Sequence, residues 1–349
     1  MAPVVRALGR RRGVESVVCV TGQHRQMLDQ VLDVFDITPD IDLRLMRANQ
    51  GVGDFAATAL DALNGALDQV KPDVVLVQGD TTTASMAALA AFYRRIPVGH
   101  IEAGLRTNDP ENPFPEEINR RLADVVSRYH FAPTRASADA LRREGYAARS
   151  IHVTGNTVVD ALQFMIARQQ KTRAAVVKAN PGEPLILVTS HRREAFGEPL
   201  RRICRALLEI ASRRPDIRIV YPVHLNPNVR GPVNELLGGH PRIDLIEPQP
   251  YDAFVALMSR SALIVTDSGG VQEEAPALGV PVVIIREKTE RGEAVAAGAA
   301  RLAGTTTKGI VRAVMAELAS KRRVKRNVFG DGRASERIVK VLVADRRRR

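Results

Sequence analysis

Short β-branched runs alternate with helix-like segments along most of this chain, and the stretch 263–285 shows the pattern most clearly. The apolar run 263–265 is followed by a glycine-containing turn at 268–270 and by a helix-like segment from 271 to 278. The next run, 280–285, is again β-branched and has no polar interruption, as expected for a strand that is buried on both faces. This order predicts a βαβ unit with a glycine turn at the carboxyl end of its first strand.

The turn at 268–270 suits an anion such as a phosphate. Ser268 is expected to cap the helix, while Gly269 and Gly270 would let a ligand approach the backbone closely. Free backbone N–H groups and the positive end of the helix dipole would favour a negative charge here. Glu274, in the following helix, can accept two hydroxyl groups of a ribose. A plainer interpretation stays open, namely an ordinary βαβ turn before a helix that begins with acidic residues.

Polar residues also follow the other predicted strands. The run 73–77 leads into QGDTTT, the run 96–101 overlaps HIEAGLRT, and the run 185–188 leads into TSHRRE. Strands that alternate with helices indicate parallel sheets, which place ligand sites at the carboxyl ends of their strands. The predicted fold class is therefore α/β, with two Rossmann-like parallel-sheet domains facing each other across a cleft and a linker within 160–184.

The composition is compatible with two such domains. A chain of 349 residues is too long for one ordinary doubly wound domain. No apolar run reaches the roughly 18 residues that span a bilayer, and no secretory signal is visible, so we expect a cytoplasmic protein with no membrane partner. The two cysteines, Cys19 and Cys204, are expected to be small buried hydrophobic residues that form neither a disulfide nor a metal site.

The net charge of +12 invites a nucleic-acid interpretation. However, the excess is dispersed and partly terminal, because 346–349 alone supplies four positive charges. Aromatic residues make up only 4% of the chain, and no basic run is interleaved with stacking side chains. A basic surface would equally attract an anionic small substrate, and we expect no nucleic-acid partner.

Three acidic residues follow separate segments of the first predicted sheet. Asp80 comes after one strand, Glu102 after the next, and Glu116 stands at a helix start. His100 lies two residues before Glu102, which would place both on the same face of their strand. Arg120 is four residues after Glu116 and is expected to pair with it. A shared sheet edge would make the carboxylates an acid–base set, although capping or a salt bridge remains an alternative for each.

Histidines suggest further chemistry. His191 and Arg192 follow a strand in the sequence HRRE, which suits anions. His224 lies in a proline-bracketed turn, where it is either functional or merely packed. The alternative of a metal site would draw on Asp80, His100, Glu102 and His191. Such a site would need ligands from both domains, and the sequence has neither a cysteine pair nor an HExxH motif, so we expect no metal.

The chain departs from the doubly wound pattern at its start. Such a domain normally begins with a strand, often the central one, whereas residues 2–12 are predicted to form a helix. We therefore expect either that the first strand is absent or that the true start lies upstream.

Eight motifs occur in order along the chain. They are TGQH at 21–24, QGDTTT at 78–83, HIEAGLRT at 100–107, FPEEINR at 114–120, GNTVVDAL at 155–162, HRRE at 191–194, YPVHLNPNV at 221–229 and TDSGGVQEEAPALGVPVV at 266–283. Together they resemble the non-hydrolysing UDP-N-acetylglucosamine 2-epimerases, from Met1 to about Gly332. The resemblance implies the two-domain glycosyltransferase-B-type fold. It implies a sugar and acid–base domain at 1–160, a UDP-binding domain at 161–332, and a C-terminal helix and basic tail at 333–349 that pack back on the first domain.

The resemblance also implies the reaction. Members of the family interconvert UDP-N-acetylglucosamine and UDP-N-acetylmannosamine without a metal or other cofactor, and they supply surface polysaccharide synthesis. In the family mechanism, a base removes the proton on carbon 2 while UDP leaves carbon 1. UDP then adds back to the bound 2-acetamidoglucal after reprotonation on the other face. A homodimer is the usual state of the family.

By motif match, the resemblance assigns site residues. The acid–base candidates are Asp80, Glu102 and Glu116, with the choice of base left open, and His191 completes the catalytic set. The substrate-binding set comprises Arg120, Phe254, Ser268, Gly269, Gly270 and Glu274, with Phe254 near the uracil, Glu274 at the ribose and the turn at the diphosphate. Positions that contact a second, regulatory UDP-N-acetylglucosamine in some relatives are matched by Gln23, Glu117, Arg192 and His224.

Two departures from the family pattern bear on activity. The family has a strand and a loop close to GTRPEAIK before the position of Met1, so we expect this chain to lack both, and catalysis depends on that loop more than nucleotide binding does. Gly292 stands where the family motif TERPEA has proline, which loosens a loop near the nucleotide. The alternatives are a hydrolysing 2-epimerase that releases N-acetylmannosamine and UDP, a glycosyltransferase of the same fold, and an inactive nucleotide-sugar-binding protein.

Overall fold

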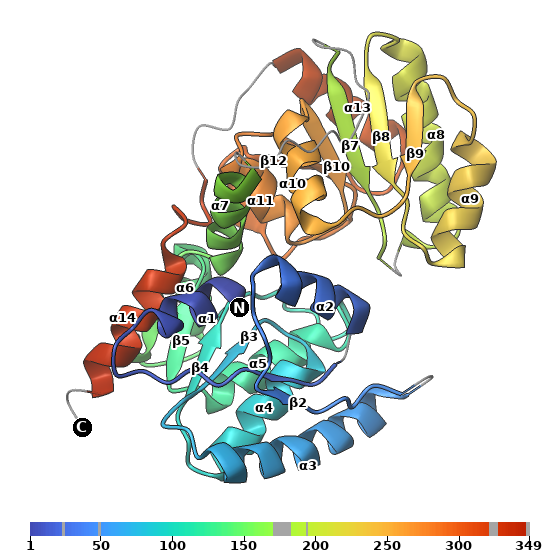
Figure 1. Cartoon of the computed structure of the whole chain (residues 1–349). Coiled ribbons are helices and arrows are strands. Elements are labelled where there is room, and N and C mark those ends of the chain that lie inside the picture. Colours follow the sequence, from blue (N-terminus) through green and yellow to red (C-terminus); the bar gives the residue numbers. More distant parts are fainter. Residues whose placement is uncertain (23–24, 48–49, 170–182, 193–194, 321–326, 347–349) are drawn as a thin grey trace. The chain divides into compact units, whose positions relative to one another are not determined.

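The computed structural model divides the chain into two compact units. Unit 1 comprises Met1–Ala161 and Phe329–Arg349, and unit 2 comprises Leu162–Val328 (Figure 1). The structure describes all residues except 23–24, 48–49, 170–182, 193–194, 321–326 and 347–349. Gln23 and most of the linker expected at 160–184 therefore lie outside the described residues. Within the described ranges, no helix combines the length and the apolar character that crossing a membrane requires.

Unit 1 alternates strands and helices, as the β-branched runs predict. Its elements are α1 (Ala2–Gly9), β1 (Cys19–Val20), α2 (Arg25–Val34), β2 (Ile41–Asp42), α3 (Val52–Val70), β3 (Val75–Gln78), α4 (Thr82–Tyr93), β4 (Val98–Ile101), α5 (Glu116–Val126), β5 (Tyr129–Ala132), α6 (Arg135–Arg143), the 3-10 helix η1 (Ala148–Ser150), β6 (Ile151–Val153), the first part of α7 (Thr157–Gln169), and α14 (Ala334–Arg346). Parallel pairing gives one sheet of order β3-β4-β5-β6 and a separate pair, β1-β2.

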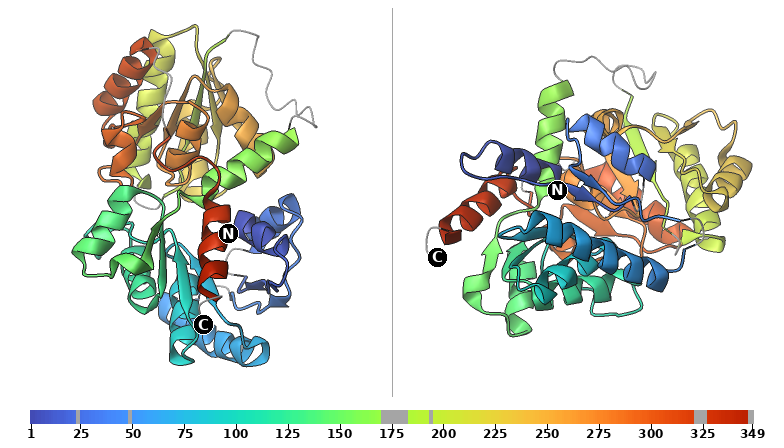
Figure 2. Two further views of the ribbon diagram at one scale, coloured as in Figure 1. Left: turned by 90° about the vertical axis from the view of Figure 1, so that its left-hand side faces the viewer. Right: turned by 60° about the horizontal axis from the view of Figure 1, so that its bottom comes forward.

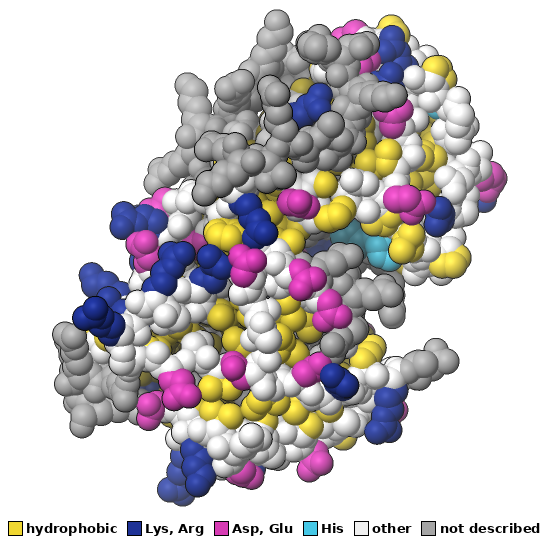
Figure 3. Space-filling view, in the orientation of Figure 1, with side chains coloured by type: hydrophobic (Ala, Val, Ile, Leu, Met, Phe, Trp, Pro, Cys, Tyr) yellow, Lys and Arg dark blue, Asp and Glu magenta, His cyan; other side chains and the backbone are white. Residues whose placement is uncertain are grey.

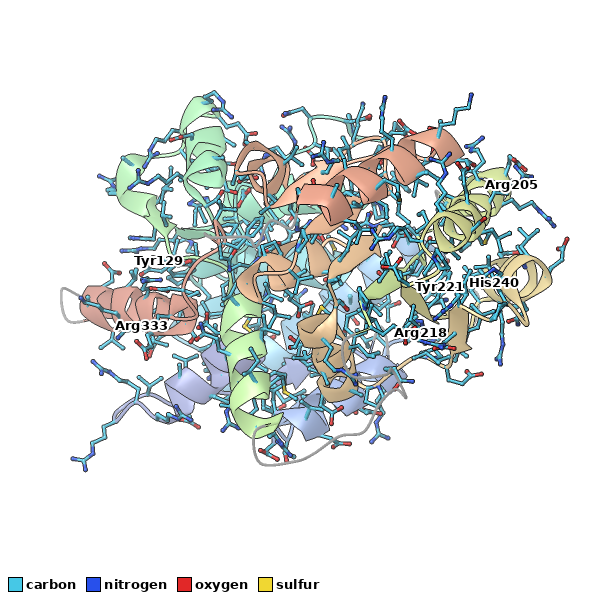
Figure 4. All side chains as sticks on the ribbon, turned by 90° about the horizontal axis from the view of Figure 1, so that it is seen from above. Tyr129, Arg205, Arg218, Tyr221, His240 and Arg333 are labelled. Carbon is cyan, nitrogen blue, oxygen red and sulfur yellow. The ribbon has the colours of Figure 1, made fainter. Side chains whose placement is uncertain are left out.

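The C-terminal helix α14 belongs to unit 1 and packs against α1, at the other end of the sequence (Figures 1 and 2). Ile338 and Val4 share an apolar cluster with Phe131 of the sheet. The Asp160 carboxylate accepts hydrogen bonds from the first backbone N–H groups of α14, which have no partner inside the helix. At the far end of α14, Asp345 accepts a 2.6 Å bond from the hydroxyl of Tyr129, which is labelled in Figure 4.

A cavity of about 1330 Å³ lies between β1 and β3, where a continuous sheet would place another strand. Cys19 of β1 lines this cavity and is exposed, so the expectation of a buried Cys19 is wrong. The residue is uncovered because β1 has a strand neighbour on one edge only. Cys204, by contrast, is buried in the core of unit 2 as expected.

Unit 2 is built on one parallel sheet. Its elements after α7 are β7 (Leu185–Thr189), α8 (Glu198–Arg213), β8 (Arg218–Pro222), α9 (Pro227–Leu237), β9 (Ile243–Ile246), α10 (Tyr251–Arg260), β10 (Leu263–Thr266), α11 (Val271–Ala277), β11 (Val282–Ile284), α12 (Gly292–Ala296), β12 (Ala300–Leu302) and α13 (Thr307–Ser320). The strand order is β12-β11-β10-β7-β8-β9. This is the doubly wound order, in which the chain reverses direction between β7 and β10.

The central strands of unit 2 form its apolar core. The strands β7, β8 and β10 are apolar and buried on both faces, because helices cover the sheet on each side. Tyr221 of β8 is fully buried (Figure 4). Arg218, at the start of the same strand, donates hydrogen bonds to the carboxylates of Glu183 and of Asp244 on β9. The α/β fold class with parallel sheets is therefore confirmed. In a doubly wound sheet, ligands bind where the chain reverses, which is beside the loops that follow β7 and β10.

Candidate functional site

Two acidic residues of unit 1, Asp80 and Glu117, pair with one buried arginine. The Arg120 side chain is 3% exposed, and its guanidinium donates to Asp80 and, over 3.0 Å, to Glu117. The expected pairing of Arg120 with Glu116 is wrong. Glu116 is the first residue of α5, and Arg120 turns from this helix toward Asp80, which follows β3. The pair brings a cation to one of the predicted acid–base candidates.

Glu117 is fully buried and holds the loop that follows β4. Its carboxylate accepts hydrogen bonds from the backbone N–H groups of Thr107 (3.0 Å) and Asn108 (3.2 Å), and from the side chains of Arg120 and Arg121. Because a buried carboxylate is stable only when its oxygens are paired, these contacts explain how a charge can lie here.

Glu102 lies just beyond β4 in a left-handed backbone conformation, with φ of 69°. It therefore does not share a strand face with His100, and that expectation is wrong, because the strand ends at Ile101. The Gln78 side-chain amide donates to Glu102 over 3.2 Å. Gly79 also has a positive φ, and a Cβ there would lie 3.1 Å from a Glu102 carboxylate oxygen. A non-glycine residue in this conformation is strained, which is typical of functional positions.

Glu116 differs from the other carboxylates of unit 1. Its Oε2 atom is buried, and among the described residues it has no hydrogen-bond partner. An acceptor that is held away from water without a partner is ready to take a proton or a hydroxyl group from a ligand.

A buried histidine–aspartate pair, His100 and Asp124, contacts the loop that carries Asp80. The ring nitrogens of His100 contact an Asp124 carboxylate oxygen (2.6 Å) and the backbone carbonyl of Gly79 (2.9 Å). Both partners are acceptors, so the ring donates from both nitrogens. Burial lowers the pKa of His100, but the Asp124 carboxylate and the carbonyl outweigh it and raise that pKa above its ordinary value. The histidine thus holds the loop that carries Asp80.

The other oxygen of Asp124 accepts 2.8 Å and 3.3 Å bonds from Arg106 and from the backbone of Gly104. Asp124 was not predicted as a site residue, although its spacing on α5 indicates one. Glu117, Arg120 and Asp124 are spaced by three and four residues, which places them on one face of α5. A charged face on a helix packed against a sheet predicts buried ion pairs.

A second buried carboxylate, Asp267, organises the loops of unit 2. It is 0% exposed and follows β10. Its Oδ2 atom accepts from the Ser190 hydroxyl and from the backbone N–H groups of His191 (2.9 Å) and Arg192 (3.0 Å). Burial raises the pKa of Asp267, but the hydrogen bonds around His191 outweigh it and lower that pKa. The carboxylate ties the loop after β7 to the turn after β10.

Histidines gather on the surface of unit 2, where Figure 3 shows exposed histidine atoms in cyan. The rings of His191 and His224 stack with centroids 6.0 Å apart, and the His191 side chain is 44% exposed. Burial and the neighbouring His191 lower the pKa of His224. Arg192 and Phe254, both half-buried, belong to the loop after β7 and to α10.

The glycine turn after β10 has a guanidinium against it. A Cβ on Gly269 would lie 2.5 Å from an Arg291 nitrogen, so a side chain at 269 would displace that cation. The expectation that Ser268 caps α11 is wrong. The helix begins at Val271, as predicted, but Gly270 holds the N-cap position and no side chain caps the helix. The helix ends at Ala277, one residue before the predicted end. Arg291 also pairs with the buried Glu273.

Glu274 is held by Tyr251 of α10, whose hydroxyl donates to it over 2.6 Å. Burial raises the pKa of Glu274 to about 7, and the Tyr251 hydrogen bond opposes that rise. Tyr251 is a second residue that sequence reasoning missed, since no spacing along the chain links 251 to 274. Within the described part of the chain, no group of three or more side chains has the arrangement of a metal site.

These features define an α/β protein with parallel sheets, carboxylates at the strand ends of one unit and a glycine turn beside an arginine in the other. Residues 6–343 match the UDP-N-acetylglucosamine 2-epimerase family. The UDP-N-acetylglucosamine 2-epimerase of Escherichia coli K12 is 49% identical over 99% of this chain and 95% of its own length. The chain therefore belongs to this family, and the expected resemblance and enzyme class are confirmed.

Two solved structures are also similar. The Neisseria meningitidis UDP-GlcNAc 2-epimerase bound to UDP-GlcNAc has a TM-score of 0.94 and 46% identity, covering 99% of this chain and 96% of that one. The Methanocaldococcus jannaschii UDP-GlcNAc 2-epimerase in complex with UDP-GlcNAc and UDP has a TM-score of 0.86 and 34% identity, covering 98% of this chain and 95% of that one.

The His100–Asp124 pair predicts a specific pH dependence of stability. The pKa of His100 is higher in the folded protein than in the unfolded chain, where it is about 6.5. Below this unfolded pKa, the pair makes its full contribution to the free energy of unfolding. That contribution is lost as pH rises through the folded pKa. Asp124→Asn removes the carboxylate that contributes most to raising the pKa of His100. Burial should then outweigh the Gly79 carbonyl and lower that pKa, so stability should instead rise with pH through the unfolded value. We expect the substitution to cost about 3–5 kcal/mol, since it leaves buried charges without their partner.

Urea unfolding of both proteins between about pH 5.5 and 8.5 measures this difference. Asp139→Asn, at an exposed carboxylate on α6, is the matched control and should keep the pH profile of the parent. Parallel profiles for Asp124→Asn and the parent would show that His100 is uncharged in the folded protein.

Proposed function

We propose that this chain interconverts UDP-N-acetylglucosamine and UDP-N-acetylmannosamine by eliminating UDP and adding it back. The observation that carries the proposal is the set of carboxylates in unit 1, one of which has a buried oxygen without a partner among the described residues. Removal of the carbon 2 proton needs a base, and reprotonation on the other face needs an acid, so one carboxylate alone does not suffice. Membership of the 2-epimerase family supports the same reaction.

The proposed acid–base groups are Asp80, Glu102 and Glu116. Glu116 has the free oxygen, Glu102 is held in a strained backbone, and Asp80 is charge-paired with Arg120. As the C2–H bond breaks, its electron pair forms the C1–C2 double bond, and the C1–O bond pair leaves with UDP.

The proposed binding residues for UDP belong to unit 2. Gly269 and Gly270 offer backbone N–H groups and Ser268 offers its hydroxyl to the diphosphate, with the Arg291 guanidinium against the turn. His191 stabilises the charge that develops on the departing diphosphate, since Asp267 holds its backbone in place. Glu274 accepts the ribose hydroxyl groups.

Three further assignments complete the proposal. Phe254 packs near the uracil. Arg192 and His224 are candidate contacts for a second, regulatory nucleotide sugar.

Incubation with UDP-N-acetylglucosamine in deuterated water tests the reaction. We expect NMR to show deuterium at carbon 2 of intact nucleotide sugar, in both epimers. Release of free N-acetylmannosamine with UDP would instead establish the hydrolysing alternative. If the carbon 2 proton never exchanges although UDP binds, the chain is only a nucleotide-sugar-binding protein.

Variants separate the two kinds of residue. Glu102→Gln should slow the exchange at least about 100-fold while changing UDP affinity little, because it acts in proton transfer. Glu274→Gln should weaken UDP binding about tenfold, which corresponds to about 1.4 kcal/mol. Glu111→Gln, at an exposed loop carboxylate, is the control for both measurements. The assignment fails if Glu102→Gln loses UDP affinity and Glu274→Gln keeps it.

We also propose that the chain forms a homodimer through the outer face of α5. Ile118, Leu122 and Val125 recur at helical spacing and are 42%, 46% and 67% exposed. Phe92 and Tyr93, at the end of the neighbouring α4, are also exposed. A contiguous apolar stripe is unusual on the surface of a monomer and suits a self-complementary contact with a second copy.

Sedimentation velocity checks this interface. The parent should sediment as a dimer, and the double variant Leu122→Lys with Val125→Lys should sediment as a monomer, because four charges would be buried in the symmetric contact. Val153→Lys, at an exposed apolar position on β6, should leave the dimer intact. A monomeric parent would contradict the proposal.

A further inference from the structure

The two carboxylate oxygens of Glu274 differ in their surroundings. Oε1 accepts the 2.6 Å hydrogen bond from the hydroxyl of Tyr251, which is the one donor to this carboxylate among the described residues. Oε2 lies beside the glycine turn, since a Cβ on Gly270 would be 3.9 Å from it. Chain neighbours aside, that Cβ would meet no other described atom within 4 Å, so the space between Gly270 and Oε2 is open. The protein therefore holds one oxygen and leaves the other to a ligand that reaches the turn.

Tyr251 is the first residue of α10, and the segment around it is rigid. Pro248 and Pro250 restrict the backbone φ angles just before the helix, which limits how the chain can enter it. Four residues into α10, Val255 is fully buried and anchors the helix, which packs against β7. The hydroxyl of Tyr251 is thus presented to Glu274 from a fixed helix end. The carboxylate is therefore oriented before a ligand binds, which lowers the entropic cost of binding.

The bond from Tyr251 also acts on the charge of Glu274. Burial raises the pKa of this carboxyl to about 7, and the hydrogen bond from Tyr251 opposes the rise. Hydroxyl groups donate more strongly to an ionised carboxylate than to a neutral acceptor. Tyr251 therefore favours the form of Glu274 that best accepts further hydroxyl groups.

The order of these residues matches the order of the groups in a nucleoside diphosphate. Tyr251 and Phe254 are three residues apart and so lie on one face of α10. Tyr251 reaches Glu274, whose Oε2 lies beside Gly270 of the turn. With Phe254 at the base and the turn at the diphosphate, as proposed above, Glu274 and its partner Tyr251 belong to the ribose between them.

We propose that Tyr251 is a positioning residue through which unit 2 selects ribonucleotides over 2′-deoxyribonucleotides, because its hydroxyl directs Oε2 of Glu274 toward the ribose hydroxyl groups. The inference rests on the ribose contact of Glu274 under the proposed function. A 2′-deoxyribose lacks one of these hydroxyl groups and would leave a buried carboxylate oxygen without a donor, which is unfavourable. Without the Tyr251 hydroxyl, the carboxylate loses its fixed direction, so the two kinds of nucleotide should bind more nearly alike.

Isothermal titration calorimetry of the full chain with UDP and with 2′-deoxy-UDP tests this role. The measurements are made at about pH 8, above the pKa of about 7 of Glu274, so that this carboxyl is ionised in the parent. The variants are Glu274→Gln and Tyr251→Phe, of which the second removes the hydroxyl and keeps the ring. Ser259→Ala is the matched control, because it removes a hydroxyl from the same helix, where Ser259 donates to the helix's own backbone over 2.8 Å.

We expect the parent and Ser259→Ala to bind UDP about tenfold or more tightly than 2′-deoxy-UDP. Tyr251→Phe should bind UDP about tenfold more weakly than the parent, and 2′-deoxy-UDP within about twofold of it, so that the preference is nearly lost. Retained affinity for 2′-deoxy-UDP also shows that the variant folds. A merely structural role of Tyr251 would weaken the binding of both ligands to the same extent, and this result would overturn the proposal. Tyr251→Leu, which also lacks the hydroxyl, must show the same selective loss and covers the case in which Tyr251→Phe does not fold.

The remaining outcomes separate this inference from the proposed function. If the parent does not distinguish the two ligands, or if Glu274→Gln keeps the preference for UDP, the ribose contact of Glu274 is wrong and the inference fails with it. If Glu274→Gln loses the preference but Tyr251→Phe keeps it, Glu274 binds the ribose without help from Tyr251, and the inference alone is overturned.

Discussion

The buried carboxylate of Asp124 is the contact on which the candidate site of unit 1 depends. It pairs with two buried side chains, His100 and Arg106, and through His100 it holds the carbonyl of Gly79, next to Asp80. A charge in a protein interior is tolerated only when it is paired and hydrogen-bonded, so these groups must fold together or not at all. The loop that carries Asp80 is therefore held by a buried ion pair.

Unit 2 uses the same device at its own strand ends. Asp267 is buried after β10 and accepts backbone hydrogen bonds from the loop that follows β7. Parallel strands bring the carboxyl ends of neighbouring strands together, but they do not determine the path of the loops beyond them. In both units a buried carboxylate supplies that missing constraint. The exposed residues, such as His191, can then face a ligand without a large loss of conformational entropy on binding.

Much of the fold follows from local pattern, whereas the contacts within the site do not. The β-branched runs predicted the main strands and their parallel class, because these depend on neighbours in sequence. The partner of Arg120 was predicted wrongly, since helical spacing offers both Glu116 and Glu117 and only tertiary packing adds Asp80. The bond from Tyr251 to Glu274 joins two separate helices, which no spacing reveals. The exposure of Cys19 depends on which strands are adjacent, which is also a long-range property.

The central claim is that UDP leaves carbon 1 and returns during each epimerisation. Substrate with ¹⁸O in the bridge between carbon 1 and the β-phosphorus tests it most directly, because departed UDP can rotate its terminal phosphate before it adds back. Phosphorus NMR should show the label moving into non-bridging positions of the recovered nucleotide sugars as epimers form. Epimerised product that keeps all of its label in the bridge would show that the C1–O bond stays intact, and would contradict the account.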